Sequence, residues 1–294
     1  GVVLHAHAAQ QLHGLFVGLR ARRVANAAAL GQKELPVPES PLELKITVQG
    51  GVGTASEHNF LLEHYQVDSV GWGSPFLLVP EATSVDNNTR KLLAEAKEND
   101  FYLSHISPLG VPFNTLRGTT NEIVREKRIQ ANKAGSSCPK KFLALHKDAE
   151  GNGICTASKK FQDEQLATLE ERKQTLSIEQ YESYKNSITE KSCLCVGLAN
   201  ASYLENNIPI KGQDQGIVVC PGPNLAYFDQ EVSLKKMIQH IYGNDTVLRV
   251  TNRPNVFIKE LKMYLDYFKK ECKAVASEST AAQVKNLQSF NKNM

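Results

Sequence analysis

The feature that most constrains this chain is a pair of glycine-rich turns, each placed after a strand-like apolar run. The first run, residues 44–48, leads into the turn GGVG at residues 50–53, and the second, residues 67–70, leads into GWGS at residues 71–74. A segment of helical character, residues 55–65, lies between them. This order predicts two parallel strands joined by a crossover helix, as where a (β/α)8 barrel forms a phosphate site after its last two strands.

The glycines of these turns suit a backbone that binds an anion. Glycine adopts positive φ without strain and lets the backbone approach a phosphate closely. Free N–H groups at the start of a helix also favour negative charge. One such turn alone would indicate no more than a tight reversal of the chain, whereas two turns that each close a parallel-type strand favour a phosphate site.

The two turns also carry a resemblance to a known family. GGVGT, followed some twenty residues later by VDSVGWGSPFL, resembles the last two strands of the nitronate monooxygenase-type FMN barrels, formerly called 2-nitropropane dioxygenases. A further segment, GVPFNTLRG at residues 110–118, is similar to one that follows the barrel in that family. The resemblance covers about residues 1–122. The chain departs from the family pattern in lacking its Gly-Gly-His signature and in having Trp72 where the family has a smaller residue.

The resemblance implies an FMN-dependent oxidoreductase that oxidises a small carbanion-forming substrate at the flavin. It also implies the residues of the cofactor site, which are Gly50, Gly51, Gly73 and Ser74 around the phosphate, Gly53 as a support of the first turn, and Trp72 near the flavin. FMN would carry the redox chemistry, while the protein would position it. A barrel enzyme acting on a phosphorylated metabolite would use the same two turns, and this alternative stays open.

His7 is the candidate for the catalytic base. In the resembling family a catalytic histidine lies one βα unit before the Gly-Gly strand, and His5, His7 and His13 occupy that neighbourhood here. A neutral imidazole there would take a proton from the carbon next to an electron-withdrawing group and leave a carbanion for oxidation. A purely structural histidine is the competing interpretation.

The predicted fold class is α/β, with the C-terminal βα units of a TIM-type (β/α)8 barrel in residues 1–122 and a mostly helical, Cys-containing region in residues 123–294. A complete barrel needs eight βα units and about 250 residues, so we expect its earlier strands to be absent from this chain. We expect strands at residues 2–5, 101–105 and 217–219, helices at 8–30, 88–99, 122–134, 159–190 with a break near Ser177, 193–204, 233–242 and 255–272, and a frayed end after residue 275.

The cysteines support a second hypothesis. Five of the six lie between residues 138 and 220, mostly in segments that contain Gly, Pro or Ser. Clustered thiolates ligate iron–sulfur clusters and zinc, although no C-x-x-C pair is present, and ordinary buried thiols are the simpler interpretation. The predicted metal ligands are Cys138, Cys155, Cys193 and Cys195, with Cys220 in reserve. In this alternative the protein binds an iron–sulfur cluster or zinc, and the half-barrel is structural.

The composition is ordinary for a soluble globular protein, and the resemblance implies a small-molecule substrate. In 294 residues the net charge is +3, which is too small to indicate nucleic acid as a partner. The sequence contains no run of 18 apolar residues and no evident secretory signal, so we expect no membrane association. Six cysteines are too few for a disulfide scaffold, and we therefore expect a cytoplasmic protein with reduced thiols.

Overall fold

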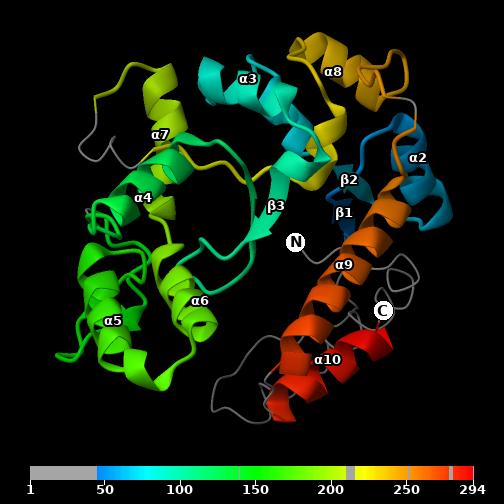
Figure 1. Cartoon of the computed structure of the whole chain (residues 1–294). Coiled ribbons are helices and arrows are strands. Elements are labelled where there is room, and N and C mark those ends of the chain that lie inside the picture. The colour runs from blue at the N-terminus through cyan, green and yellow to red at the C-terminus, as the bar shows by residue number, and fades with distance from the viewer. Residues whose placement is uncertain (1–44, 139, 210–215, 251, 278–280, 294) are drawn as a thin grey trace, which may run out of the picture. The chain divides into compact units, whose positions relative to one another are not determined.

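The computed structural model describes residues 45–138, 140–209, 216–250, 252–277 and 281–293 (Figure 1). The predicted strand at residues 2–5, the predicted helix at 8–30 and the candidate base His7 lie outside the described residues.

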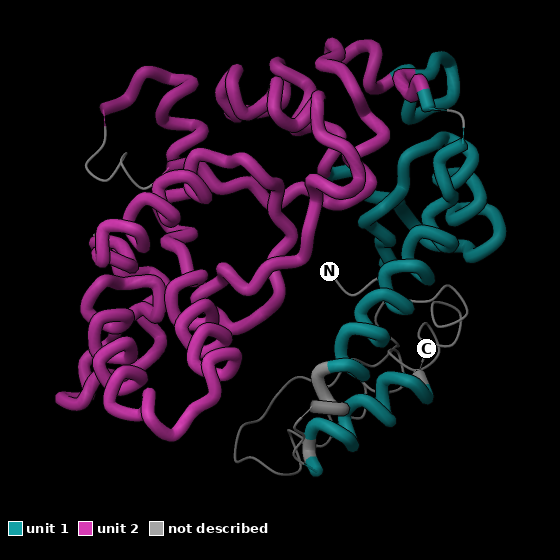
Figure 2. Tube along the Cα trace, viewed as in Figure 1, with its two compact units in different colours: residues 1–73, 239–246, 250–294 teal, residues 74–238, 247–249 magenta. Residues whose placement is uncertain are grey.

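Contacts within the chain divide it into two compact units (Figure 2). Unit 1 comprises residues 1–73, 239–246 and 250–294, and unit 2 comprises residues 74–238 and 247–249. The division predicted at residue 122, between a partial barrel and an appended helical region, rests on the family resemblance and stays a prediction.

The centre of the described part of unit 1 is the predicted strand–helix–strand segment. Strands β1 (Thr47–Gln49) and β2 (Ser69–Gly71) pair in parallel, and α2 (Ala55–His64) connects them. The helix begins where Thr54, in extended backbone conformation, accepts a hydrogen bond from the Glu57 N–H through its side-chain oxygen, 3.2 Å away. The predicted parallel pair and its crossover helix are therefore confirmed.

The apolar core of unit 1 forms between this segment and the start of a C-terminal helix. Val52, Leu61 and Val67 are buried together, and Phe257 packs against them. Phe257 belongs to α9 (Val256–Ser277), which is longer than predicted.

The end of the chain is helical, and the prediction that it is frayed was wrong. Helix α10 (Ala281–Asn293) packs against α9. Its Phe290 contacts the rings of Tyr264, Tyr267 and Phe268 on α9. A polar sequence with one well-placed aromatic residue thus gains its stability from tertiary contacts that periodicity alone does not reveal.

Unit 2 is mostly helical, and its elements follow one another as short pieces. They are η1 (Ser74–Leu78), α3 (Asn87–Glu95), η2 (Glu98–Asp100), β3 (Phe101–Ser104), β4 (Phe113–Leu116), α4 (Thr120–Gln130), β5 (His146–Lys147), β6 (Gly153–Ile154), α5 (Lys159–Glu171), η3 (Lys173–Thr175), α6 (Ile178–Thr189), α7 (Leu194–Glu205) and η5 (Pro223–Tyr227). Helix α8 (Leu234–Ile241) then carries the chain from unit 2 into unit 1.

The strands of unit 2 form two small antiparallel sheets, β3 with β4 and β5 with β6. Together with β1 and β2 they make three two-stranded sheets within the described residues. That β1 and β2 belong to a (β/α)8 barrel stays a prediction.

Local sequence signals placed most helices of unit 2 correctly. The predicted break near Ser177 is the start of α6, where Ser177 and Gln180 form a capping box. The predicted strand at residues 217–219 was wrong, because its backbone finds partners outside any sheet. The Ile217 N–H donates to the Thr120 hydroxyl at 2.8 Å, and the Val218 N–H donates to the Gly197 carbonyl at 2.9 Å.

None of the described helices combines the length and the apolar character needed to cross a membrane.

Candidate functional site

The two glycine-rich turns leave the same edge of the β1–β2 sheet. The pairing register is Thr47 with Ser69, Val48 with Val70, and Gln49 with Gly71, so both strands end together at their carboxyl ends. Gly50 and Trp72 are the residues that directly follow the last pair. The parallel pairing therefore gathers the two predicted cofactor turns at one place, as the phosphate hypothesis requires.

The first turn has a backbone conformation that favours glycine. Gly50 has φ of 105° and Gly51 has φ of 77°, both in the region that L-residues rarely adopt. At Gly51 there is also no room for a side chain, because a Cβ would lie 2.9 Å from a methyl group of Val256. The close approach of α9 thus fixes this glycine independently of any ligand.

A buried carboxylate, that of Glu57, binds the backbone of the first turn. Glu57, on α2, accepts hydrogen bonds from the Gly53 N–H at 2.9 Å and from the Val256 N–H at 2.7 Å. It also pairs with the Arg253 guanidinium at 2.7 Å, and the two side chains are only 8% and 5% exposed. Since the Gly53 N–H donates to Glu57, it is not available to a ligand.

The same arginine ties the turn to the segment before α9. A second nitrogen of Arg253 donates to the Gly51 carbonyl at 2.9 Å. The positive charge of Arg253 is balanced by Glu57, so the turn gains no net charge from this pair. An anion bound here would depend on backbone N–H groups and on the precise shape of the turn.

Trp72 is held by two histidines. Its indole N–H donates to His58 Nδ1 at 3.0 Å, and its ring meets that of His240 edge to face, with centroids 5.8 Å apart. His240 is 3% exposed and bonds the Gly53 carbonyl through Nε2 at 2.9 Å. Because a carbonyl only accepts, the proton of His240 lies on Nε2. Trp72 is thus a packing element of the turn, whatever ligand lies beside it.

Burial lowers the pKa of both histidines. The pKa of His58 falls below its ordinary value because of burial, and so does that of His240, against opposing hydrogen bonds to the backbone of Gly53 and Asp245. Neutral imidazoles near pH 7 follow from these directions. His58 then accepts the Trp72 proton at Nδ1, as the observed contact requires.

The second turn differs from the first in being open. Apart from Gly73 itself and the two residues next to it, no described residue has an atom within 4 Å of the position that a Cβ would take at Gly73, and its φ is not positive. The next residue, Ser74, begins unit 2, and its hydroxyl accepts a hydrogen bond from the Gly222 N–H at 2.8 Å. The predicted phosphate role of Ser74 stays a prediction.

The predicted metal ligands lie in three segments of unit 2. Cys155 and Cys193 are 4% and 6% exposed, while Cys138 and Cys195 are half-buried, and all four are free thiols. Burial raises the pKa of Cys155 to about 11, and the charges of the other three cysteines act in the same direction. The four cysteines span 57 residues of the sequence (195 − 138 = 57).

The four thiols do not form a site for one metal ion. The described His, Cys, Asp and Glu residues contain no group of three or more that could hold a metal ion. The predicted reserve ligand Cys220 is exposed as a whole residue. Partial burial of its thiol raises the pKa, against a hydrogen bond to the backbone of Asn114 that lowers it. Cys272 lies on α9, in unit 1.

Unit 2 also contains a cavity of about 400 Å³, which the sequence did not indicate. Its lining includes Asp86, Thr89, Thr119 and Asn200. One carboxylate oxygen of Asp86 and the amide oxygen of Asn200 are buried without a hydrogen-bond partner among the described residues. Such acceptors suit a ligand that carries hydrogen-bond donors.

Sequence reasoning missed three residues around the first turn. Glu57 carries a local signal, since a Thr followed three residues later by Glu is typical of a helix start. His240 and Arg253 carry none, because they reach the turn from nearly two hundred residues further along the chain. Their positions depend on tertiary structure.

Comparisons with known proteins give little beyond this geometry. No model of a protein family matches the chain, and no curated protein matches it. Among solved structures, it is similar to the enoyl reductase domain of MlnA from the macrolactin biosynthesis cluster of Bacillus amyloliquefaciens, at 15% sequence identity and a TM-score of 0.33. The alignment covers 80% of this chain and 50% of that one, so this chain spans half of its length. A similarity at this TM-score does not establish a shared fold.

Proposed function

We propose that this protein is an FMN-dependent oxidoreductase that oxidises a small carbanion-forming substrate, with the flavin phosphate held by Gly50, Gly51 and Gly73. The observation that carries the proposal is the parallel pairing of β1 with β2, which brings both glycine turns to one edge of the sheet. The motif resemblance of these turns to the nitronate monooxygenase-type barrels supports FMN over other phosphate ligands.

The residues of the turns fit a phosphate group. Gly50 and Gly51 have positive φ values, which glycine adopts without strain and which let the backbone turn tightly around a ligand. Apart from the two residues next to Gly73, no described residue has an atom within 4 Å of its missing side chain, so a ligand can approach its backbone closely. Gly53 does not contribute, because its N–H already binds Glu57.

Bound FMN would supply an acceptor for the electrons of the substrate carbanion. The chain would hold the phosphate through the two turns. Glu57 and Arg253 fix the conformation of the first turn through hydrogen bonds to Gly53 and Gly51. The proton of the substrate would pass to a base, for which His7 remains the candidate from the sequence.

The absorption spectrum of the purified full chain, with and without added FMN, tests this proposal. The wild-type protein is expected to retain the bands of an oxidised flavin after removal of free FMN, and Gly73→Ala is expected to retain them only in part, because its methyl group would hinder the close approach of the phosphate. Gly73→Asp is expected to lose them, because its carboxylate would repel the phosphate. A wild-type protein that takes up no FMN but binds phosphorylated metabolites would instead favour the barrel enzyme that acts on such compounds.

A further inference from the structure

The cavity of unit 2 is lined by three helices of that unit. The first two turns of α3 and of α4 and the second half of α7 contribute to its wall, and Gly216 and Ile217 complete the lining among the described residues. Its volume of about 400 Å³ is that of a typical small-molecule site. None of the lining residues belongs to the two glycine turns.

Contacts of the chain itself hold one wall of the cavity in place. The Ile217 N–H donates to the Thr120 hydroxyl at 2.8 Å, which joins the segment after α7 to the start of α4. Gly216 has φ of 77° and lies so close to α4 that a Cβ there would clash with the backbone of Asn121. The cavity wall formed by this segment is therefore present before any ligand binds.

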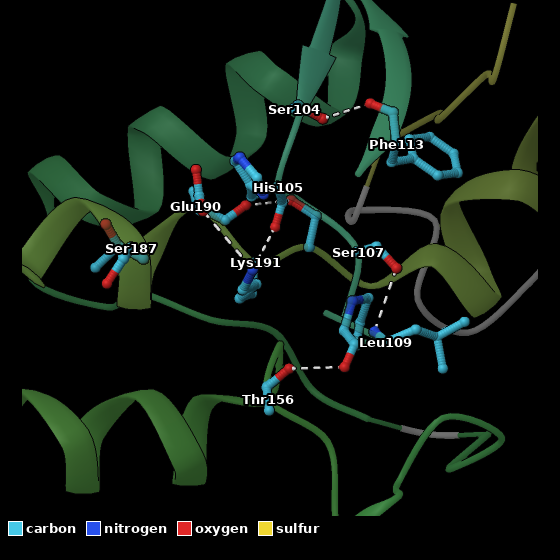
Figure 3. A network of polar contacts seen from close by, with 12 residues as sticks. Ser104, His105, Ser107, Leu109, Phe113, Thr156, Ser187, Glu190 and Lys191 are labelled. Carbon is cyan, nitrogen blue, oxygen red and sulfur yellow. Dashed lines mark hydrogen bonds and ion pairs between the residues drawn. The ribbon is translucent and has the colours of Figure 1, made fainter. Parts of the chain in front are cut away.

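The loop between β3 and β4 fixes the start of α7, the helix that forms another wall (Figure 3). The Lys191 ammonium donates to the His105 carbonyl at 2.5 Å, and the Ser192 N–H donates to the Ile106 carbonyl at 3.0 Å. Leu194, the first residue of α7, packs with Ile106 in a buried cluster. Polar and apolar contacts thus both position this helix on the loop.

Asn200, on α7, has an amide oxygen that the protein leaves unused. The side chain is buried, at 2% exposure, and its nitrogen donates to the Gly216 carbonyl at 2.9 Å. Because a carbonyl only accepts, this contact fixes the orientation of the amide. The amide oxygen is the remaining polar atom, and it is buried without a hydrogen-bond partner among the described residues.

Asp86 has one carboxylate oxygen that the fold uses and one that it does not. The first accepts a hydrogen bond from the Thr89 N–H at 3.1 Å and caps α3. The second is buried without a hydrogen-bond partner in the described part of the chain. The buried Arg90, four residues further along, pairs with Glu205 and Glu231 instead. Capping of the helix therefore accounts for only one of the two oxygens.

We propose that this cavity binds a small molecule that carries a primary ammonium group on an apolar body. The ammonium would donate hydrogen bonds to the unused oxygens of Asp86 and Asn200. A buried charge or acceptor without a partner costs free energy, and a bound cation would remove this cost at both side chains. The apolar body would contact the side chains of Leu92, Val124 and Ile217, which also line the cavity.

The lining disfavours other classes of ligand. Asp86 is its one charged residue, so a phosphate or a carboxylate would meet negative charge with no Lys, Arg or His of the lining to balance it. A neutral alcohol would leave the Asp86 carboxylate without a counter-charge. A metal ion is disfavoured as well, since the described residues contain no group of three His, Cys, Asp or Glu that could hold one.

Isothermal titration calorimetry of the full chain at neutral pH tests the proposal with three related probes. They are phenethylammonium, phenethyl alcohol, which lacks the charge, and phenethyltrimethylammonium, which lacks the N–H donors. The wild type is expected to bind phenethylammonium at least about ten-fold more tightly than either of the others. Asp86→Asn is expected to lose this preference and to keep α3, because asparagine caps a helix as well as aspartate does.

Two further variants keep the result interpretable. Leu92→Trp, which would fill the cavity, is expected to abolish binding of all three probes. Asp163→Asn, which removes an exposed carboxylate of α5, is expected to bind them as the wild type does. Far-UV circular dichroism verifies that each variant is folded, and if Asp86→Asn is not, the probe comparison on the wild type and the Leu92→Trp result decide.

Three results would overturn the proposal. They are a wild type that binds phenethylammonium no more tightly than phenethyl alcohol, a folded Asp86→Asn that keeps the preference, and a Leu92→Trp variant that binds like the wild type. Absence of any binding to the wild type counts as the first of these. Because no residue of the glycine turns is involved, the outcome does not depend on whether the protein binds FMN.

Discussion

At the scale of single residues, Gly51 and Gly73 form a natural pair of tests. Gly51→Ala is expected to lower the free energy of unfolding by about 1–3 kcal/mol, because alanine would hold positive φ and press against Val256. Gly73→Ala has neither obstacle, and its free energy of unfolding is expected to stay within about 0.5 kcal/mol of the wild type. Urea denaturation measures both values. Equal stability of the two variants would contradict the close packing of α9 on the first turn.

Glu57 is expected to stabilise unit 1 more than any surface charge. Replacing it with Gln removes the partner of Arg253, whose side chain is 5% exposed. Loss of one member of a buried ion pair lowers the free energy of unfolding by about 3–5 kcal/mol. A double-mutant cycle with Arg253→Gln measures the coupling, and the double variant is expected to be less destabilised than the sum of the single variants. Strict additivity would show that the two side chains do not interact.

His240 is expected to make the stability of unit 1 depend on pH. Burial lowers its pKa in the folded protein below the ordinary value of 6.5, so the unfolded chain binds the proton more readily. The contribution to stability is therefore fully present above pH 6.5 and is lost as the pH falls through the folded-state pKa. Urea denaturation between pH 7.5 and pH 5 is expected to show a smaller loss in His240→Gln than in the wild type. The exposed His64, replaced by Gln, provides the control, and an identical slope for all three proteins would contradict the prediction.

At the scale of elements, the sequence predicted those whose signals are local. The apolar runs and glycines around β1 and β2 indicated a parallel pair, and the helix between them began and ended within a residue of its predicted limits. The serine before α6 likewise marked a helix start by a local signal. The segment at residues 217–219 was misassigned because a short apolar run does not reveal whether its backbone pairs with a strand or with a helix end.

Gln162, on helix α5, is expected to hold the segment around Cys155 to the segment before Cys193. Gln162→Leu would remove the donor of the Thr156 and Lys191 carbonyls, at a cost of about 0.5–1.5 kcal/mol in the free energy of unfolding for each hydrogen bond lost. The same change is expected to speed alkylation of Cys155, followed by mass spectrometry, because the segments would separate more readily. Gln165→Leu, on the exposed face of the same helix, is the control. Unchanged alkylation in Gln162→Leu would mean that other contacts hold the segments together.

At the scale of the whole molecule, contacts between distant parts of the chain decided what the sequence could not predict. Arg253 and His240 complete the first turn from the other end of unit 1. Phe290 stabilises a terminal helix whose sequence is polar. In unit 2, Lys191 likewise accepts a hydrogen bond from Gln162 through its carbonyl and donates one to the β3–β4 loop through its ammonium.

The most direct test of the FMN proposal is a comparison of FMN with riboflavin, which lacks the phosphate. Both are titrated into the full wild-type chain and into Gly73→Asp and Gly73→Ala, with quenching of flavin fluorescence as the measurement. The wild type is expected to bind FMN at least ten-fold more tightly than riboflavin, Gly73→Ala is expected to show a smaller preference, and Gly73→Asp is expected to lose it. Equal affinity of the wild type for the two flavins would contradict a phosphate site in the glycine turns.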